Sequence, residues 1–598
     1  MKEMVSTSGA SVALRIVRFA WPVLAAMASG GCGVSAPSVG MEDYIAEDTA
    51  GLACEREENA VQPQIGKRRR LAKETLLYAE FLSKYGMFQN YLHYWIDRPL
   101  YCDRALRPET FAYETPESFA VHGAQLRKAG LDGLDVFVSA RRNGQIARLD
   151  GWFEKAGTPE LNILPIVSYG EAIDRRGPDV KGFAAAVREV QGGGRATRIN
   201  GKALVPTYNY RMFNAEQHKA FMRELKAELG NDDFILCGDV NQRTLARLQG
   251  AFRRNGALSA AETNELETAL REVLDATGGI QLTATEKIRM PDGQYCTCYD
   301  LSFFEKCTAP LVERLLALPE YREKVLGFYV HQGYVNHMTG HDASEEGTFT
   351  LRSNLASVLR LNPDYLIFFE WNEVNENTMF QPTLYSGRSV GRIVKWYADF
   401  VNGRPPAPYP GDDPSAPGLV LSHRVTYKPG EKIRFEILNV PCGESVREHT
   451  AQLSLTDEAG KTLLRFPAET FGTDRLASVG YAVPGEAFPV GSSISCVLTV
   501  DGRRWDGFHP IRSDATVCRN YKEVRQSLRD GLGVTAPALR VTRLGDGVYR
   551  CESEVALKDP DERLASLEMV LNEDEVAAFD PSGEFDAGRY DIIQLAFT

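Results

Sequence analysis

Short apolar runs alternate with longer amphipathic segments from about residue 85 to about residue 400. The runs are bounded by turn-forming residues, a pattern typical of strands that are buried on both faces of a parallel sheet. We therefore predict strands over Met87–Ile96, Gly133–Ala140, Asn162–Ser168, Lys202–Tyr208, Phe234–Val240, Gly279–Ala284, Val325–Gln332 and Tyr365–Trp371.

The segments between these runs carry apolar residues at helical spacing. This spacing predicts a helix over Arg69–Lys84, where Leu71, Leu76, Leu77 and Phe81 recur. Further helices are predicted over Pro116–Ala129, Gly144–Ala156, Asp179–Val190, Ala215–Leu229, Arg243–Phe252, Phe303–Leu318 and Gly347–Leu361.

Strands that alternate regularly with helices in this number predict an α/β fold, a (β/α)8 (TIM) barrel, over residues 69–402. A doubly wound open sheet is the alternative. The barrel is favoured because no glycine-rich phosphate loop follows the first predicted strand.

The helical pattern stops at a proline-rich segment, residues 403–416, which predicts a linker between domains. Short alternating runs with regular turn signals follow it and predict a β-sandwich over residues 417–515. Residues 516–598 predict a second β-sandwich or a continuation of the first, after a helix-like insert over Asn520–Gly531. The predicted strands are Leu419–Tyr427, Lys432–Leu438, Ala451–Leu455, Ser493–Val500, Arg504–Ile511, Ala538–Leu544, Gly547–Val555, Leu567–Leu571 and Tyr590–Phe597.

Composition and charge narrow the class of protein. The chain has 598 residues, of which 25% are charged, and this is ordinary globular composition with enough length for several cores. The net charge of −12 argues against nucleic acid as a partner. The basic run over residues 67–70 is a single local cluster, which we expect in a solvated loop or at the start of a helix.

Residues 1–32 predict an export signal. Basic residues precede a short apolar run over Phe19–Ala28, and small residues then lead to Cys32, as at a bacterial lipoprotein cleavage site. We expect an exported protein that is anchored to a membrane by lipid at Cys32, in the periplasm or at the cell surface. The alternative is ordinary cleavage and a soluble periplasmic protein. Residues 33–68 are polar and acidic without a clear period, and they predict a tether or extension.

The other ten cysteines are compatible with an oxidising compartment. Their densest cluster is Cys296, Cys298 and Cys307, which has no histidine nearby to complete a zinc site. We therefore expect one local disulfide and scattered buried thiols, and we expect neither a metal nor a cofactor.

Polar and aromatic residues gather where the predicted strands end. In a (β/α)8 barrel the carboxyl ends of the strands form the active site. Each residue taken alone is best explained as part of the core or rim, but together they predict a substrate-binding surface. The candidates are Tyr91, His93, Trp95, Asp97, Tyr208, Asn209, Asp239, Tyr329, His331, Gln332, Trp371 and Asn372.

The last predicted strand is followed at once by three carboxylates, Glu370, Glu373 and Glu376, interleaved with a tryptophan and amides. Because burying a carboxylate is costly unless it is paired or used, these residues need an explanation. The simplest is a solvated acidic loop. A sugar site explains more, since an aromatic ring supports a pyranose, amides bind its hydroxyls, and paired carboxylates supply acid and base. We expect Glu370 to pair with a basic group in the structure.

The segment from Trp371 to Pro382 resembles the Trp-Asn-Glu-x-x-Glu-Gly-Thr-x-x-Glu-Pro segment of glycoside hydrolase family 99, whose members are (β/α)8-barrel endo-α-mannosidases and α-mannanases. Val374-Asn375 replaces an aromatic-His pair of that family, Asn377 replaces a glycine and Gln381 replaces a glutamate. The run from Tyr91 to Trp95 loosely resembles the aromatic first strand of the same family.

The resemblance implies a retaining glycoside hydrolase. It gives Glu376 the acid/base role and gives Glu373 the role of deprotonating the sugar's own 2-hydroxyl, which attacks the anomeric carbon. Related α-1,3-glucanase barrels of family 71 make α-glucan an alternative to α-mannan. From another class, the alternative is a non-catalytic surface lipoprotein that binds glycans through a degenerate barrel site.

Overall fold

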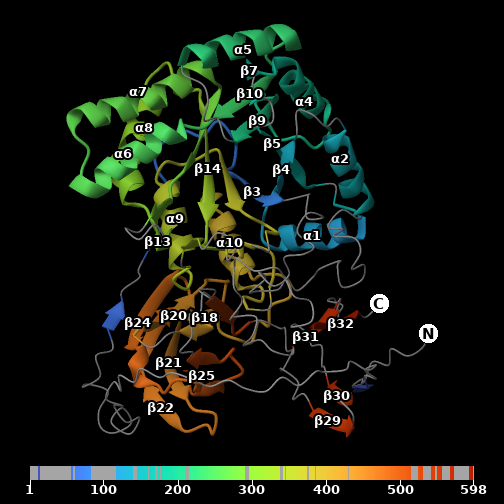
Figure 1. Cartoon of the computed structure of the whole chain (residues 1–598), viewed down its shortest axis with the longest axis vertical. Coiled ribbons are helices and arrows are strands. Elements are labelled where there is room, and N and C mark those ends of the chain that lie inside the picture. The colour runs from blue at the N-terminus through green and yellow to red at the C-terminus, as the bar shows by residue number, and fades with distance from the viewer. Residues whose placement is uncertain are drawn as a thin grey trace, which may run out of the picture.

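The computed structural model describes two main parts of the molecule, a barrel and a β-sandwich (Figure 1). The described residues are 61–81, 116–138, 144–158, 160–168, 179–208, 215–289, 295–336, 341–343, 345–373, 376–383, 385–427, 430–513 and 523–529, together with short strands at 11–13, 55–57, 173–174, 177–178, 540–545, 548–554, 566–570 and 592–596.

Eight parallel strands close into a barrel, which confirms the predicted fold class. Each strand pairs in parallel with the next, and the last pairs with the first, so that no edge remains open. In chain order the strands are β3 (Leu76–Phe81), β4 (Gly133–Val138), β5 (Asn162–Ser168), β9 (Lys202–Tyr208), β10 (Phe234–Gly238), β11 (Gly279–Thr283), β14 (Val325–His331) and β17 (Tyr365–Phe369).

The first barrel strand is β3, and the predicted helix over Arg69–Lys84 is wrong. β3 lies between β17 and β4, the place that we predicted for Met87–Ile96. Residues 82–115 are outside the described residues. The error has a physical cause: a short run that is buried on both faces shows no alternation, so its spacing also fits a buried helix.

Helices cover the outside of the barrel (Figure 1). Seven of the predicted helices are present with small shifts at their ends, the one before β14 beginning as a π-helical turn over Phe304–Thr308. Two helices were not predicted, α7 and α10; α7 begins with a capping box between Ser259 and Glu262. The helices are α1 (Pro116–Lys128), α2 (Gln145–Lys155), α4 (Val180–Gly192), α5 (Ala215–Leu229), α6 (Gln242–Asn255), α7 (Ala260–Ala276), α8 (Ala309–Leu316), α9 (Phe349–Leu359) and α10 (Ser389–Val401).

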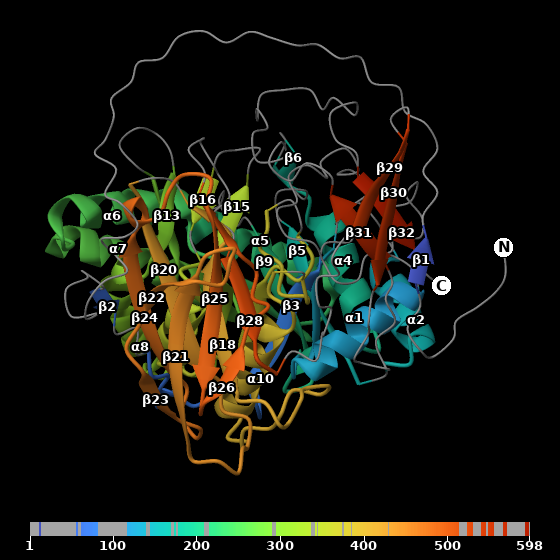
Figure 2. The same cartoon turned by 90° about the horizontal axis from the view of Figure 1, so that it is seen from below.

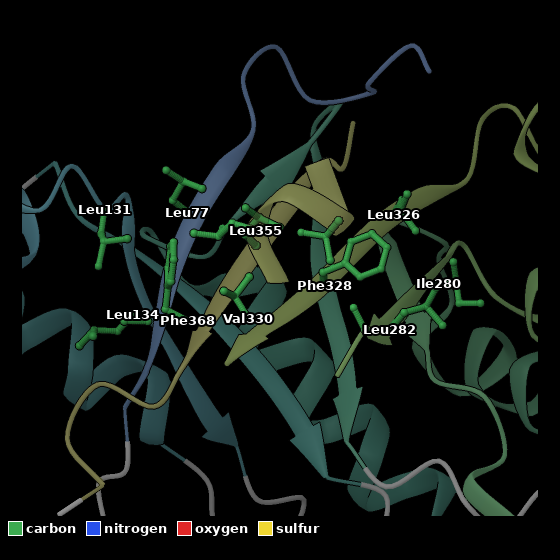
Figure 3. Close-up of a cluster of buried hydrophobic side chains, with 14 of the residues drawn as sticks. Leu77, Leu131, Leu134, Ile280, Leu282, Leu326, Phe328, Val330, Leu355 and Phe368 are labelled. Atoms are coloured by element: carbon green, nitrogen blue, oxygen red, sulfur yellow. The ribbon is translucent and has the colours of Figure 1, made fainter. Parts of the chain in front are cut away.

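The barrel strands separate two hydrophobic layers. Alternate residues of each strand point to opposite faces, so one set packs under the helices and the other fills the barrel. The outer layer includes Leu77, Leu134, Phe328 and Phe368 (Figure 3). The interior layer includes Tyr78, Leu164, Leu204, Val325, Tyr365 and Ile367.

A buried aspartate fastens the amino end of the barrel. Asp364, fully buried before β17, accepts hydrogen bonds from the backbone N–H groups of Ala72 (3.0 Å) and Leu326 (2.9 Å). Arg68 forms an ion pair with Asp364 at 2.6 Å and donates to the carbonyl oxygens of Lys324 and Asn362. The basic run over residues 67–70 is therefore not simply a solvated loop, because its Arg68 helps to hold the amino end of the barrel together.

The β-sandwich lies below the barrel in Figure 1 and has two sheets with a shared apolar core. The first sheet has the order β2–β24–β20–β18–β28, and Figure 2 shows β28 beside β18. Its strands are β2 (Glu55–Glu57), β18 (Leu419–Arg424), β20 (Lys432–Asn439), β24 (Ala477–Pro484) and β28 (Glu523–Ser527). The second sheet contains β19 (Thr426–Tyr427), β21 (Glu448–Thr456), β22 (Thr462–Arg465), β23 (Glu469–Gly472), β25 (Ser493–Val500), β26 (Arg503–Trp505) and β27 (Ile511–Ser513).

Two sandwich strands come from segments to which we gave other structures. The predicted helix-like insert over Asn520–Gly531 is wrong, because it contains β28, which pairs antiparallel with β18. β2 comes from the predicted tether and pairs antiparallel with β24. In both cases the segment forms a strand because it pairs with a neighbouring strand, and the local sequence alone does not indicate this.

The remaining strands form small sheets. They are β1 (Ser11–Ala13), β6 (Ile173–Asp174), β7 (Gly177–Pro178), β12 (Glu286–Arg289), β13 (Tyr295–Asp300), β15 (Tyr334–Asn336), β16 (His341–Ala343), β29 (Arg540–Gly545), β30 (Val548–Glu554), β31 (Ser566–Val570) and β32 (Ile592–Ala596). A further short strand, β8 (Arg198–Ile199), pairs antiparallel with β9 and belongs to the barrel sheet. Within the described ranges, no helix has the length and apolar character needed to cross a membrane.

Candidate active site at the carboxyl end of the barrel

The loop after β17, residues 370–383, folds back on itself at the carboxyl end of the barrel, and we call it the glutamate loop. The backbone N–H of Phe380 donates to the carbonyl oxygen of Glu370 at 3.0 Å, and that of Gln381 donates to the carbonyl oxygen of Trp371 at 3.1 Å. Asn377 has a positive φ of 52°, a left-handed conformation that asparagine tolerates better than most residues. These bonds hold the glutamates of the loop against the barrel mouth.

Glu370 is buried among other carboxyl groups, and our expectation that it pairs with a basic group is wrong. Its Oε2 accepts a hydrogen bond from the Thr378 hydroxyl at 2.9 Å. Burial raises its pKa well above the usual value, and the charges of Glu373, Glu376 and Glu80 raise it further. Its surroundings therefore favour the neutral, protonated form of the Glu370 carboxyl.

The two predicted catalytic glutamates differ in exposure. Glu373 is only 5% exposed, whereas Glu376 is half-buried. The hydroxyl of Tyr334, on β15, donates a hydrogen bond to Glu376 Oε1 at 2.5 Å. Tyr334 thereby fixes the direction in which the Glu376 carboxyl points. The residues between the two glutamates, 374 and 375, are outside the described residues.

Two acidic residues of the barrel interior, Glu80 and Asp135, were missed by our site prediction. They are direct neighbours across β3 and β4, and both are fully buried. Burial raises the pKa of each well above its usual value, and the charges of Asp135, Glu373 and Glu376 add to the shift of Glu80. Glu80 lies two residues beyond the interior residue Tyr78, so it faces the barrel interior on the same side of β3.

The electrostatic influence of Glu373 and Glu376 on both Glu80 and Glu370 shows that these four carboxyl groups share one region. The sequence signal for Glu80 is an ionisable residue inside an apolar strand, because burying such a residue is costly unless it has a partner or a role in a site. We overlooked it because the segment was assigned to a helix.

Trp371 and Asn372 are buried. Trp371 is 1% exposed, and its indole N–H donates to Nδ1 of His122, on α1, at 3.0 Å. Burial lowers the pKa of His122 to about 3, so its ring is neutral and can accept this bond. The structure thus places Trp371 in the core under α1, and its ring offers no open face to a sugar. Asn372 has no exposed surface.

Other predicted residues lie where their strands end. Tyr329 and His331, on β14, are buried and pack on the ring of Phe369, with centroid distances of 5.6 and 4.8 Å. Asp239 follows β10 and is partly exposed. Gln332 follows β14 but is fully buried, and its amide binds backbone groups of the glutamate loop.

Several predicted residues cannot be placed. Tyr91, His93, Trp95, Asp97 and Asn209 are outside the described residues, and so is the side chain of Tyr208. The side chains of Cys296 and Cys298 are also outside them, while Cys307 is a free thiol. In the part of the chain that is described, no group of three or more His, Cys, Asp or Glu side chains is arranged to hold a metal ion.

No protein-family model matches this chain, and no curated protein matches it. Solved structures that are similar include a family GH99 endo-alpha-mannosidase from Bacteroides thetaiotaomicron, with 13% identity over 55% of this chain and 98% of that chain and a TM-score of 0.39. A glycoside hydrolase-like protein has 10% identity over 61% of this chain and 99% of that chain, with a TM-score of 0.38. An endoglucanase from Pseudomonas stutzeri has 11% identity over 57% of this chain and 95% of that chain, with a TM-score of 0.31. The assignment of the barrel rests on the strand pairings described above and not on these similarities.

Proposed function

We propose that this protein is an exported glycoside hydrolase that acts on an α-linked polysaccharide or glycan through Glu373 and Glu376. The observation that carries the proposal is the gathering of acids at the carboxyl end of the barrel. The loop after β17 brings both glutamates close enough to raise the pKa of the two buried carboxyls Glu80 and Glu370. Paired carboxyl groups at this end of a barrel suit acid/base chemistry on a glycosidic bond.

Burial divides the acids into two groups. Burial raises the pKa of Glu80, Asp135 and Glu370 and so favours their neutral, protonated forms. Neutral carboxyls can donate hydrogen bonds, and they limit the negative charge around Glu373 and Glu376. This leaves the two loop glutamates as the groups best suited to exchange protons with a substrate.

The resemblance of the loop to family 99 supports a division of labour between them. Glu376 protonates the leaving oxygen, while Glu373 takes the proton of the sugar's 2-hydroxyl, whose oxygen attacks the anomeric carbon and expels the leaving group. Water then opens the resulting epoxide from the other side, with Glu376 as base and Glu373 returning its proton. Two inversions give net retention. Tyr334 supports this role by holding the Glu376 carboxyl.

Export and a lipid anchor at Cys32 are proposals that rest on the sequence of residues 1–32. They suit an enzyme whose substrate is a polymer outside the cytoplasm. Labelling with a radioactive fatty acid in a bacterial host checks the anchor: the wild-type protein should carry label and the Cys32→Ala variant should not.

The activity is tested by incubating the purified protein with α-mannans, α-glucans and N-glycans and analysing the products. We expect saccharide release from one of these classes, with retained configuration at the new reducing end. The Glu373→Gln variant is the matched control, and it should release nothing. Binding of a glycan by wild type without any release would instead favour the non-catalytic binding protein.

A further inference from the structure

The strand β28 joins the β-sandwich to the barrel mouth. It is the edge strand of its sheet, with β18 on one side. On the other side, the backbone N–H of Arg525 donates to the carbonyl oxygen of Tyr385, in the segment that continues the glutamate loop, at 3.0 Å. Val524 packs with Tyr385 and Val425 in a small apolar cluster. The sandwich therefore touches the loop directly through its edge strand.

The side chain of Arg525 contacts the segment that follows β14 at the carboxyl end of the barrel, and it has no exposed surface. Its Nη1 donates a hydrogen bond to Gln332 Oε1 at 2.6 Å, and its Nη2 forms an ion pair with Glu345 Oε1 at 2.5 Å. Because both partners belong to the segment between β14 and α9, the guanidinium group holds both ends of that segment.

Gln332 passes this restraint to the glutamate loop. Its Nε2 donates to the carbonyl oxygens of Thr378 (2.8 Å) and Met379 (2.5 Å). The same Thr378 donates its hydroxyl to Glu370. One continuous series of contacts thus runs from the sandwich to the loop that carries Glu373 and Glu376.

We propose that Arg525 is a positioning residue for the glutamate loop, so that the site is complete only when the sandwich is docked on the barrel. The inference goes beyond the proposed function, and its effect on turnover rests on that function. A planar guanidinium can contact Gln332 and Glu345 at the same time, which a lysine cannot do with the same geometry. A shift of about 1 Å in a catalytic group can cost roughly 100-fold in rate, so a small loosening of the loop is enough.

A second buried ion pair at the same interface allows positioning of the glutamate loop to be distinguished from docking of the sandwich on the barrel. Arg352, on α9, pairs with Glu436 of β20, and both side chains are buried. Glu436 Oε2 also accepts from the backbone N–H (2.6 Å) and hydroxyl (2.8 Å) of Thr348. This pair connects the two domains through α9, Thr348 and β20, so Arg352→Met is the matched control.

The experiment compares Arg525→Met, Gln332→Met and Arg352→Met in the full chain. If Arg525 acts through Gln332, the first two variants should each lower kcat by about 10–100-fold with KM changed by less than about 3-fold. Their double variant should be no worse than the poorer single variant, because both break one series of contacts. Arg352→Met should lower the thermal midpoint of unfolding but leave kcat within about 2-fold.

Hydrogen exchange of the loop provides a readout that needs no activity. The amides of Phe380 and Gln381 should exchange at least about 10-fold faster in Arg525→Met and Gln332→Met than in wild type or Arg352→Met. If wild type has no glycosidase activity but these amides still respond, the proposed function fails and the positioning role stands.

Unchanged exchange in both variants, or equal kcat losses in Arg525→Met and Arg352→Met, would overturn the inference. Should Arg525→Met fail to fold, Gln332→Met decides, since it leaves the ion pair between Arg525 and Glu345 in place.

Discussion

The two loop glutamates should respond differently to the same substitution. In Glu376→Gln the side chain keeps its size and its contact with Tyr334 but loses the proton that the leaving oxygen needs. Turnover of an unactivated glycoside should fall by roughly 10²–10⁴-fold, whereas an aryl glycoside with a good leaving group should show a much smaller defect in its first step. Steady-state and burst kinetics on the two substrates measure the difference.

In the proposed mechanism Glu373 is the base that activates the attacking oxygen, and Glu373→Gln removes this base, which both substrates need. It should abolish turnover of both, however good the leaving group is. Circular dichroism and thermal unfolding of each variant provide the control for folding. Equal and mild effects of the two substitutions on both substrates would contradict the assignment of roles.

Sequence reasoning placed Glu373 and Glu376 directly after a barrel strand, where they lie, but it did not predict their surroundings. The apolar run up to Phe369 and the acids after it predicted the end of a buried barrel strand. Whether a neighbouring side chain faces the site depends on packing, and Trp371 turned out to be buried against His122. Asp135 sits in a run of six residues, Gly133–Val138, which we recognised as a strand without asking why an acid was buried in it.

At the level of elements, seven of the eight barrel strands were predicted to within about two residues, because each is an apolar run between turn signals. The exception, β3, shows the limit of this reasoning. Its residues from Leu77 to Phe81 are all buried, so neither face of the strand carries the polar alternation that would distinguish it from a helix.

Close packing inside the barrel makes β14 sensitive to a single methyl group. A Cβ at Gly327 would lie 1.9 Å from the ring carbon Cζ of Tyr365, on the neighbouring strand. The Tyr365 hydroxyl donates to Gln281 Oε1 at 2.7 Å, so the ring cannot move without losing that bond. Gly327→Ala should therefore destabilise the protein by about 3 kcal/mol in urea unfolding.

A glycine in open space provides the matched control. Gly151 lies within α2, and a Cβ there would meet nothing within 4 Å. Gly151→Ala should stabilise the protein by about 0.5–1 kcal/mol, since alanine favours the helix. A similar change in stability for both substitutions would mean that the Tyr365 ring is not held as described.

At the scale of the whole molecule, the barrel and the sandwich share buried charges. Glu345 and the backbone of Gly347 belong to the segment between β14 and α9, whereas Glu523 and Arg525 belong to β28. The sequence predicted both domains, but it could not predict this contact, because the partners are nearly 180 positions apart: the backbone N–H of Glu523 donates to Glu345 Oε2 at 3.3 Å across a separation of 178. Docking depends on which surfaces meet, and no local pattern encodes that.

The shared charges make the stability of the interface depend on pH. Burial raises the pKa of Glu523 from its usual 4.5 to about 8, and the charge of Glu345 adds to the shift. Between these two values the unfolded chain releases a proton that the folded chain keeps, so this group's contribution to stability is complete below about pH 4.5 and is lost as the pH rises toward 8. The free energy of unfolding should fall by about 2–5 kcal/mol across that range from this group alone.

Glu523→Gln tests this expectation, because an amide stays neutral at every pH and can still accept the hydrogen bond from Gly347. When urea unfolding is measured at steps of one pH unit, the variant should lose the part of the decline between pH 5 and pH 8 that Glu523 contributes, about 2–5 kcal/mol. The part that comes from Glu80, Asp135 and Glu370, whose pKa burial also raises, should remain. Glu458→Gln, at an exposed turn residue between β21 and β22, is the control and should follow the wild-type profile. Parallel profiles for Glu523→Gln and wild type would show that Glu523 is already ionised in the folded protein. The folded protein would then stabilise the ionised carboxylate of Glu523 by other interactions than those described above.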